Sequence, residues 1–133
     1  MEIITKQQFE KLVENGKPEN KGKDHFPVVK LFLPGTRFIW LLTEIDNEDN
    51  TIAYGLCELN MRFPQLGRVS LSEIKREKSL YHFMAERDNY FVPLYPISVY
   101  EEAARKHKHI VEDSSLLALA NTKMKNMRSK FRH

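Results

Sequence analysis

The sequence predicts an α+β fold, with an antiparallel sheet of four or five strands and helices packed against it. Two observations support this prediction. Three apolar runs within residues 27–59 are separated by two turn signals, which is typical of a three-stranded antiparallel meander. Helix-capping signals flank the meander on both sides. A chain of 133 residues is also long enough to build one core without disulfide or metal cross-links.

A first helix is expected between Thr5 and Gly16. Thr5 and Gln8 have the spacing of a capping box, and Gly16 stands where a helix stop is expected. The segment 16–25 is polar and rich in turn formers, so it is expected to form a loop.

The strands of the meander are expected at residues 27–33, 37–45 and 51–59. Pro34 to Thr36 form the first turn, and residues 46–50 form the second. If both turns are tight, Leu33 pairs with Arg37 and Ile45 pairs with Thr51.

Further elements follow the meander. Residues 68–71 are expected to form a short strand, and Ser70 is expected to cap a helix after it. Pro93 interrupts the apolar segment 88–94, so this segment is expected to be an edge strand. Two helices are expected at residues 99–107 and 115–129, the first of them capped by Ser98 and Glu101.

The predicted register divides the meander into two faces. One face is small and aliphatic, includes Cys57, and is expected to be the core face. The other face is aromatic, and it consists of Val28, Lys30, Phe32, Phe38, Trp40, Leu42, Glu44, Ile52, Tyr54, Leu56 and Glu58. Either a helix covers this aromatic face as a second core layer, or a ligand or partner does.

If a ligand or partner covers the aromatic face, the candidate contact residues are Lys30, Trp40, Glu44, Tyr54 and Arg87. The predicted register places Lys30 opposite Trp40, which allows a cation–π contact. Arg87 belongs to the acid-base-acid run Glu86-Arg87-Asp88, which is typical of a local salt bridge or of a polar binding cluster.

Catalytic patterns are weak. The predicted register separates Glu44 and Glu58 by roughly 20 Å, which is too far for a carboxylate pair to act together. Cys57 has small neighbours and is expected to be an inert thiol. His107 and His109 would point apart on a helix, so no metal site is predicted. The sequence contains no P-loop, GxGxxG or GxSxG motif, and no cofactor is predicted.

The C-terminal segment carries the basic charge of the chain. Its five basic residues are Lys123, Lys125, Arg128, Lys130 and Arg132. Removing these five charges from the net charge of +3 leaves residues 1–120 at −2. The organisation expected is therefore a domain of residues 1–113 followed by a basic amphipathic helix of residues 114–133.

Three interpretations of this helix stay open. Its apolar stripe, which consists of Leu116, Ala120, Met124, Met127 and Phe131, can dock on its own domain or form a homodimer. Its basic face can instead contact nucleic-acid phosphates. The helix can also lie on an anionic membrane or in the groove of a partner protein.

Five phrases in the sequence point to a known family. They are PVVKLF (27–32), WLLTE (40–44), IAYGLCEL (52–59), FPQLGRVSLSE (63–73) and ERDNYFVPLYPISVY (86–100). In this order they resemble a bacterial family catalogued as domain of unknown function 2958, over roughly residues 5–108. The resemblance implies no catalytic residues. It does imply an association with plasmids and integrative elements.

These observations predict a non-enzymatic accessory or binding protein of a bacterial mobile element, acting through protein or nucleic-acid contacts. The alternative is a small-ligand binder or small enzyme that uses the aromatic face. The single cysteine and the absence of an apolar leader or membrane-spanning run favour a cytoplasmic location.

Overall fold

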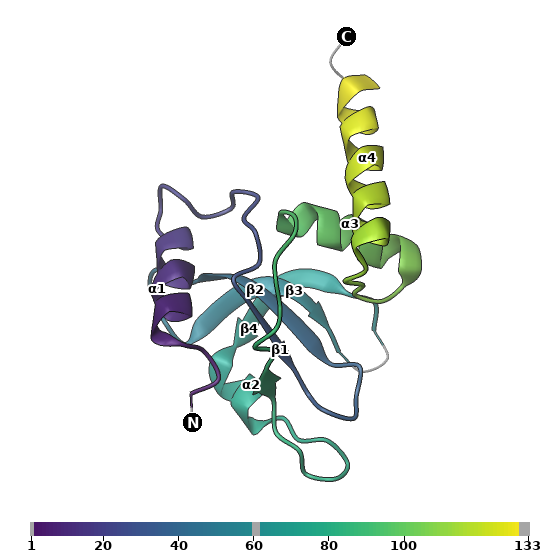
Figure 1. The fold of residues 1–133 in the computed structure, drawn as a ribbon. Coiled ribbons are helices and arrows are strands. Elements are labelled where there is room, and N and C mark those ends of the chain that lie inside the picture. Colours follow the sequence, from purple (N-terminus) through teal and green to yellow (C-terminus); the bar gives the residue numbers. More distant parts are fainter. Residues whose placement is uncertain (1, 60–61, 131–133) are drawn as a thin grey trace.

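The computed structural model describes residues 2–59 and 62–130, which form an antiparallel sheet with helices packed on it (Figure 1). The elements in chain order are α1 (Lys6–Asn15), β1 (Val29–Phe32), β2 (Ile39–Ile45), β3 (Ile52–Glu58), β4 (Gln65–Ser70), α2 (Leu71–Arg76), β5 (Glu86–Arg87), α3 (Ile97–His107) and α4 (Ser114–Lys130). The five strands lie in the order β4-β3-β2-β1-β5 and every pair is antiparallel. The predicted α+β fold is therefore confirmed.

Apolar side chains cover one face of the sheet beneath α1 and α2. Leu12 of α1 and Ile74 of α2 are buried in a cluster with Leu31, Trp40 and Leu42 of the central strands. Burial of such a cluster is the main stabilising term for a domain of this size.

The opposite face of the sheet packs against α3 and α4. Leu41 and Leu56 of the central strands are fully buried against Tyr100 of α3 and Leu117 of α4. The sheet thus lies between two helical layers. Within the described residues, no helix is both long enough and apolar enough to cross a membrane.

The turn between β1 and β2 is one residue longer than predicted. The Leu33 amide donates to the Phe38 carbonyl at 3.1 Å, so four residues form the turn. Leu31 consequently pairs with Trp40, and Lys30 pairs with Leu41. The predicted register between the first two strands is wrong by one residue, which moves Trp40 to the α1 side of the sheet.

A β-bulge at Thr43 then changes the alternation within β2. Leu42 pairs with Gly55, whereas Glu44 pairs with Tyr54, so Thr43 is an extra residue in this strand. The bulge leaves Ile45 in the buried cluster beneath α1, and it leaves Glu44 on the same face as Tyr54. The predicted aromatic face is therefore wrong as a single surface, because Trp40 and Tyr54 lie on opposite faces of the sheet.

The end of α1 holds this bulge. The Asn15 side-chain amide donates to the Thr43 carbonyl at 2.9 Å in a buried hydrogen bond. The Thr43 hydroxyl donates to the Tyr54 carbonyl at 3.2 Å. Gly16, directly after α1, lies so close to the backbone of β2 that an added Cβ would be 1.8 Å from the Ile45 carbonyl oxygen. Only glycine permits this approach of α1 to β2.

The signals for the first two helices are confirmed. The Thr5 hydroxyl accepts from the Gln8 amide and the Gln8 side chain accepts from the Thr5 amide, which completes the capping box. Ser70 caps α2 through the Glu73 amide at 3.3 Å.

Two later predictions need correction. The helix α3 begins at Ile97, directly after Pro96. The predicted cap at Ser98 is wrong, since Ser98 lies inside the helix and donates its amide and its hydroxyl to Asp24. The edge strand predicted at residues 88–94 is wrong, because none of these residues is in a strand and the strand at this edge of the sheet is β5, Glu86–Arg87.

We expect Asn15→Ala to destabilise the fold by about 1–3 kcal/mol, because it leaves the buried Thr43 carbonyl without its donor. Chemical denaturation measures this change. Asn20→Ala is the matched control, since the Asn20 amide donates at an exposed position and its loss costs less than about 0.5 kcal/mol. Equal destabilisation by the two variants would contradict the role assigned to Asn15.

Candidate functional site

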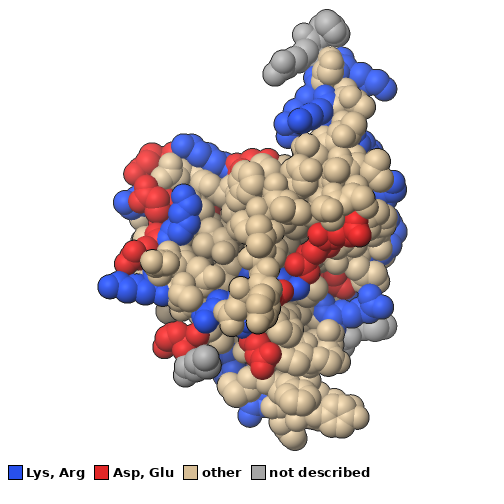
Figure 2. All heavy atoms as spheres, viewed as in Figure 1, with Lys and Arg blue, Asp and Glu red and all other residues tan. Residues whose placement is uncertain are grey.

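The outward half of α4 is the most prominent charged feature of the molecule. Beyond Met124 the helix extends away from the sheet and from α3, and its surface there carries Lys and Arg side chains (Figures 1 and 2). Lys125, Arg128 and Lys130 are all exposed. Residues 114–133 contain no acidic residue, so these cations have no compensating charge on their own helix. The fifth predicted cation, Arg132, lies outside the described residues.

The inner half of α4 docks on α3. Leu117 and Ala120 are buried, and Met124 packs partly against the same cluster. The predicted stripe is thus right for Ala120 and Met124, but Leu117 replaces Leu116 as the most buried position. Met127 is 47% exposed, and Phe131 lies outside the described residues.

An ion pair marks the point where α4 leaves the body. Lys123 Nζ lies 2.8 Å from Glu102 of α3. The hydrogen bond from Lys123 lowers the pKa of the Glu102 carboxyl below its ordinary value of 4.5. Lys123 is therefore partly neutralised within the fold. Among the described residues, Lys125, Arg128 and Lys130 have no acidic group within ion-pair distance.

Trp40 is a packing residue. Its side chain is 2% exposed and meets the Phe38 ring edge-on, with centroids 6.0 Å apart. It pairs with Cys57 on β3 and Leu31 on β1, beneath α1 and α2. No surface is left on Trp40 for a ligand.

Lys30 ties distant segments together on the other face. Its ammonium lies 2.6 Å from Glu112 and 3.2 Å from Asp88. Burial alone lowers the pKa of Lys30, but its hydrogen bonds and charge contacts with the two carboxylates raise that pKa above its ordinary value. The predicted contact with Trp40 is absent, since the Lys30 ammonium lies 5.8 Å from the Phe32 ring centroid instead.

Arg87 lies apart from the other predicted ligand residues. It pairs with Leu31 and so occupies the α1 side of the sheet, at its β5 edge. Its guanidinium donates to the Asn89 side chain at 2.8 Å and to the Glu2 carbonyl at 3.2 Å. The contact with Glu2 attaches the N-terminal segment to β5, and a ligand role for Arg87 stays a prediction.

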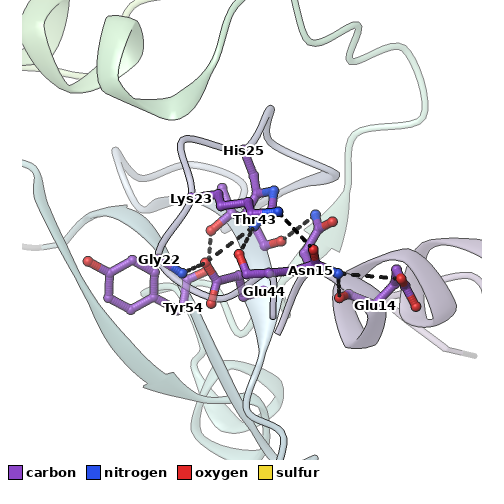
Figure 3. Close-up of polar contacts among 9 residues, drawn as sticks. Glu14, Asn15, Gly22, Lys23, His25, Thr43, Glu44 and Tyr54 are labelled. Atoms are coloured by element: carbon purple, nitrogen blue, oxygen red, sulfur yellow. Dashed lines mark hydrogen bonds and ion pairs between the residues drawn. The ribbon is translucent and has the colours of Figure 1, made fainter. Parts of the chain in front are cut away.

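Glu44 and Tyr54 line a groove of about 680 Å³ between the loop of residues 16–25, the sheet and the start of α3. The Glu44 carboxylate accepts from the Gly22 amide at 3.0 Å and lies 3.7 Å from His25 Nε2 (Figure 3). Tyr54 is 36% exposed. Glu44 therefore fixes the loop over the sheet, and a ligand role for Glu44 and Tyr54 stays a prediction.

The remaining groups singled out in the sequence have separate surroundings. Burial raises the pKa of the Cys57 thiol to about 12, which suppresses the reactive thiolate at neutral pH. Glu44 and Glu58 pair with Tyr54 and Ile39, so they remain at different positions along the ladder. The described residues contain no group of three His, Cys, Asp or Glu side chains placed to hold a metal ion.

One contact was missed by the sequence patterns. His109 Nδ1 lies 2.6 Å from Glu58 Oε2, and the Ile110 amide donates to the other oxygen of this carboxylate at 2.7 Å. Glu58 and His109 are 51 residues apart in the sequence, and no sequence motif contains both of them.

Comparison with known proteins agrees with the resemblance noted in the sequence. The family described as "Protein of unknown function (DUF2958)" matches residues 3–111. The chain belongs to the DUF2958 family. A search of curated proteins found no match, and a search of solved structures found none either. The DUF2958 match ends before α4 begins, so the basic helix lies beyond the part of the chain that defines this membership.

We expect the contact between α3 and α4 to weaken in acid. Because Lys123, and then Arg105, lower the pKa of Glu102 in the fold, the pairs of Glu102 with both cations stabilise the fold above pH 4.5 and are lost as the pH falls through the lowered value. Glu102→Gln should cost about 0.5–1 kcal/mol at pH 7, since Lys123 is exposed to solvent, and almost nothing near pH 3. Denaturation at both pH values measures this.

Glu10→Gln serves as the control, because Glu10 is an exposed residue of α1. A difference between wild type and Glu102→Gln that is the same at both pH values would rule out the ionised pair as its cause.

Proposed function

We propose that this protein is a non-enzymatic binding protein that contacts nucleic acid through the outward half of α4. It would act as a cytoplasmic accessory of a bacterial mobile element. The observation that carries the proposal is the exposed, acid-free set of Lys125, Arg128 and Lys130 on a helix that extends away from the body.

The geometry of α4 suits contact with a phosphate backbone. Lys125 and Arg128 are three residues apart and so lie on one side of the helix. With a rise of about 1.5 Å per residue, the three cations from Lys125 to Lys130 span roughly 7.5 Å along the axis. Duplex DNA carries about one negative charge per 1.7 Å of its axis, so the same span meets several phosphates.

The body of the protein supports this arrangement. Without the C-terminal cations its net charge is −2, so the overall charge of the body adds no attraction for a polyanion. The pair between Lys123 and Glu102, together with buried Leu117, fixes the base of the helix. The contact proposed is therefore a positive arm held at a fixed angle on a weakly acidic domain.

The mobile-element role has a different support. It depends on the family membership and on the association with plasmids and integrative elements that the sequence resemblance implies. Since α4 lies outside the family match, nucleic-acid contact through α4 is proposed for this chain and not for the family as a whole.

The triple variant Lys125→Gln/Arg128→Gln/Lys130→Gln tests the proposal. Fluorescence anisotropy with labelled DNA should show binding by wild type that weakens from 50 to 200 mM salt, by about 40-fold for duplex DNA and by about 20-fold for single-stranded DNA, as about three phosphate contacts predict. The triple variant should bind at least about tenfold more weakly at low salt.

A charge-matched control is Lys6→Gln/Lys11→Gln/Lys21→Gln, since these three lysines are exposed and remote from α4. The control should bind as wild type does. If wild type and the α4 variant bind equally, or if neither binds, the nucleic-acid proposal is wrong. Sedimentation of the same samples checks the competing interpretation, self-association through the apolar stripe of α4, of which Met127 is exposed.

A further inference from the structure

A second groove, distinct from α4, carries an excess of positive charge. It has a volume of about 900 Å³ and lies between the turn that joins β1 to β2, the end of β3, residues 77–80 and the end of α3. The turn and the junction of α3 with α4 lie on the same side of the molecule (Figure 1). The basic side chains that line the groove are Arg37, Arg62, Lys78, Lys108 and His109.

The four Lys and Arg side chains of this groove lack acidic partners. Within residues 2–59 and 62–130, no carboxylate lies within 4.0 Å of any of them. The acidic residues lining the groove are Glu58 and Glu77. Because Glu58 is already engaged by His109, the groove has several exposed cations whose hydrogen-bond donors face solvent and are open to a ligand.

The Glu58 carboxylate fixes the His109 ring at the edge of this groove. Glu58 is 4% exposed, and its two oxygens contact His109 Nδ1 at 2.6 Å and the Ile110 amide at 2.7 Å. The His109 side chain is 46% exposed. With Nδ1 committed to Glu58, Nε2 is the ring nitrogen available to a ligand, and no described residue bonds to it.

An aromatic ring completes the groove. Phe63 is 67% exposed, and the Lys108 ammonium lies 5.3 Å from its ring centroid. Lys108 ends α3 in the left-handed conformation with φ of 67°, and His109 follows it directly. A flat ring beside unpaired cations is the combination that binds a nucleobase and its phosphate together.

We propose that this groove binds a nucleoside phosphate. The phosphate oxygens contact Arg37, Arg62 and the His109 ring, and the base stacks on Phe63. Guanidinium groups match phosphate oxygens in pairs, and an imidazole held by a buried carboxylate presents its second nitrogen in a fixed direction. The ligand is either a free nucleotide or a nucleotide within a single strand, since both offer the same base and phosphate.

Titration of the full chain with AMP tests the proposal, with the imidazole nitrogens of the histidines followed by two-bond proton–nitrogen NMR spectra. AMP should shift the His109 Nε2 signal in a saturable way and leave the His107 signal unchanged. Inorganic phosphate should shift the same signal more weakly, and adenosine should not shift it. A His109 signal that does not respond to AMP overturns the proposal.

Variants separate binding from folding. Arg37→Gln and His109→Gln should each weaken AMP binding about tenfold, which is the loss of one charged hydrogen bond. Phe63→Ala should weaken AMP binding without changing the response to inorganic phosphate. Two control variants should bind AMP as wild type does. They are Arg76→Gln, which changes an exposed side chain of α2, and His107→Gln. Equal losses in the controls would contradict the site.

Two further comparisons define the ligand and isolate the site. In the Lys125→Gln/Arg128→Gln/Lys130→Gln variant, a trinucleotide that binds more tightly than AMP identifies a nucleic-acid strand as the ligand of the groove, and equal affinity identifies a free nucleotide. The Lys125→Gln/Arg128→Gln/Lys130→Gln variant should bind AMP normally, so failure at α4 and failure at this groove are distinguishable. Weaker AMP binding by that variant would overturn the independent site.

Discussion

The extra residue at Thr43 determines which side chains of β2 face the core, and the hydrogen bond from Asn15 holds it in place. Without a bulge, alternation from Leu42 would bury Glu44 and turn Ile45 to the opposite face. With the bulge, Ile45 completes the cluster beneath α1 and the Glu44 carboxylate instead receives the Gly22 amide. The buried hydrogen bond from Asn15 to Thr43 thus connects the end of α1 to the bulge in β2. Through the position of Glu44, the bulge also determines where the loop of residues 16–25 lies.

The two faces of the sheet serve different purposes as a result. The α1 side is an apolar core that includes Trp40. The α3 side combines an apolar centre with charged contacts that fasten segments distant in the sequence, namely Lys30 to Glu112 and Glu58 to His109. These contacts position the junction of α3 and α4. The outward half of α4 begins beyond this junction, and the basic groove includes Lys108 and His109 at its start. Both proposed binding surfaces therefore depend on how α3 and α4 pack on the sheet.

Local signals in the sequence predicted local structure, and the failures have physical causes. The Thr5 capping box and the extent of α4 depend on residues within one or two turns of helix, which the sequence displays directly. The register of β1 against β2 depends on the length of the turn between them. The turn has one residue more than predicted, and Trp40 therefore lies on the face opposite to the one predicted for it. The pair of Glu58 and His109 arises only when α3 packs on the sheet, so no spacing rule could reveal it.

Cross-strand NMR contacts between β2 and β3 test the central claim most directly. The bulge at Thr43 predicts that backbone protons of Trp40 lie opposite Cys57 and that those of Glu44 lie opposite Tyr54. A continuous ladder would instead place Glu44 opposite Ala53. Nuclear Overhauser contacts from Glu44 to Tyr54, together with those from Trp40 to Cys57, are the result expected. Contacts from Glu44 to Ala53 would contradict the bulge and the assignment of faces that follows from it.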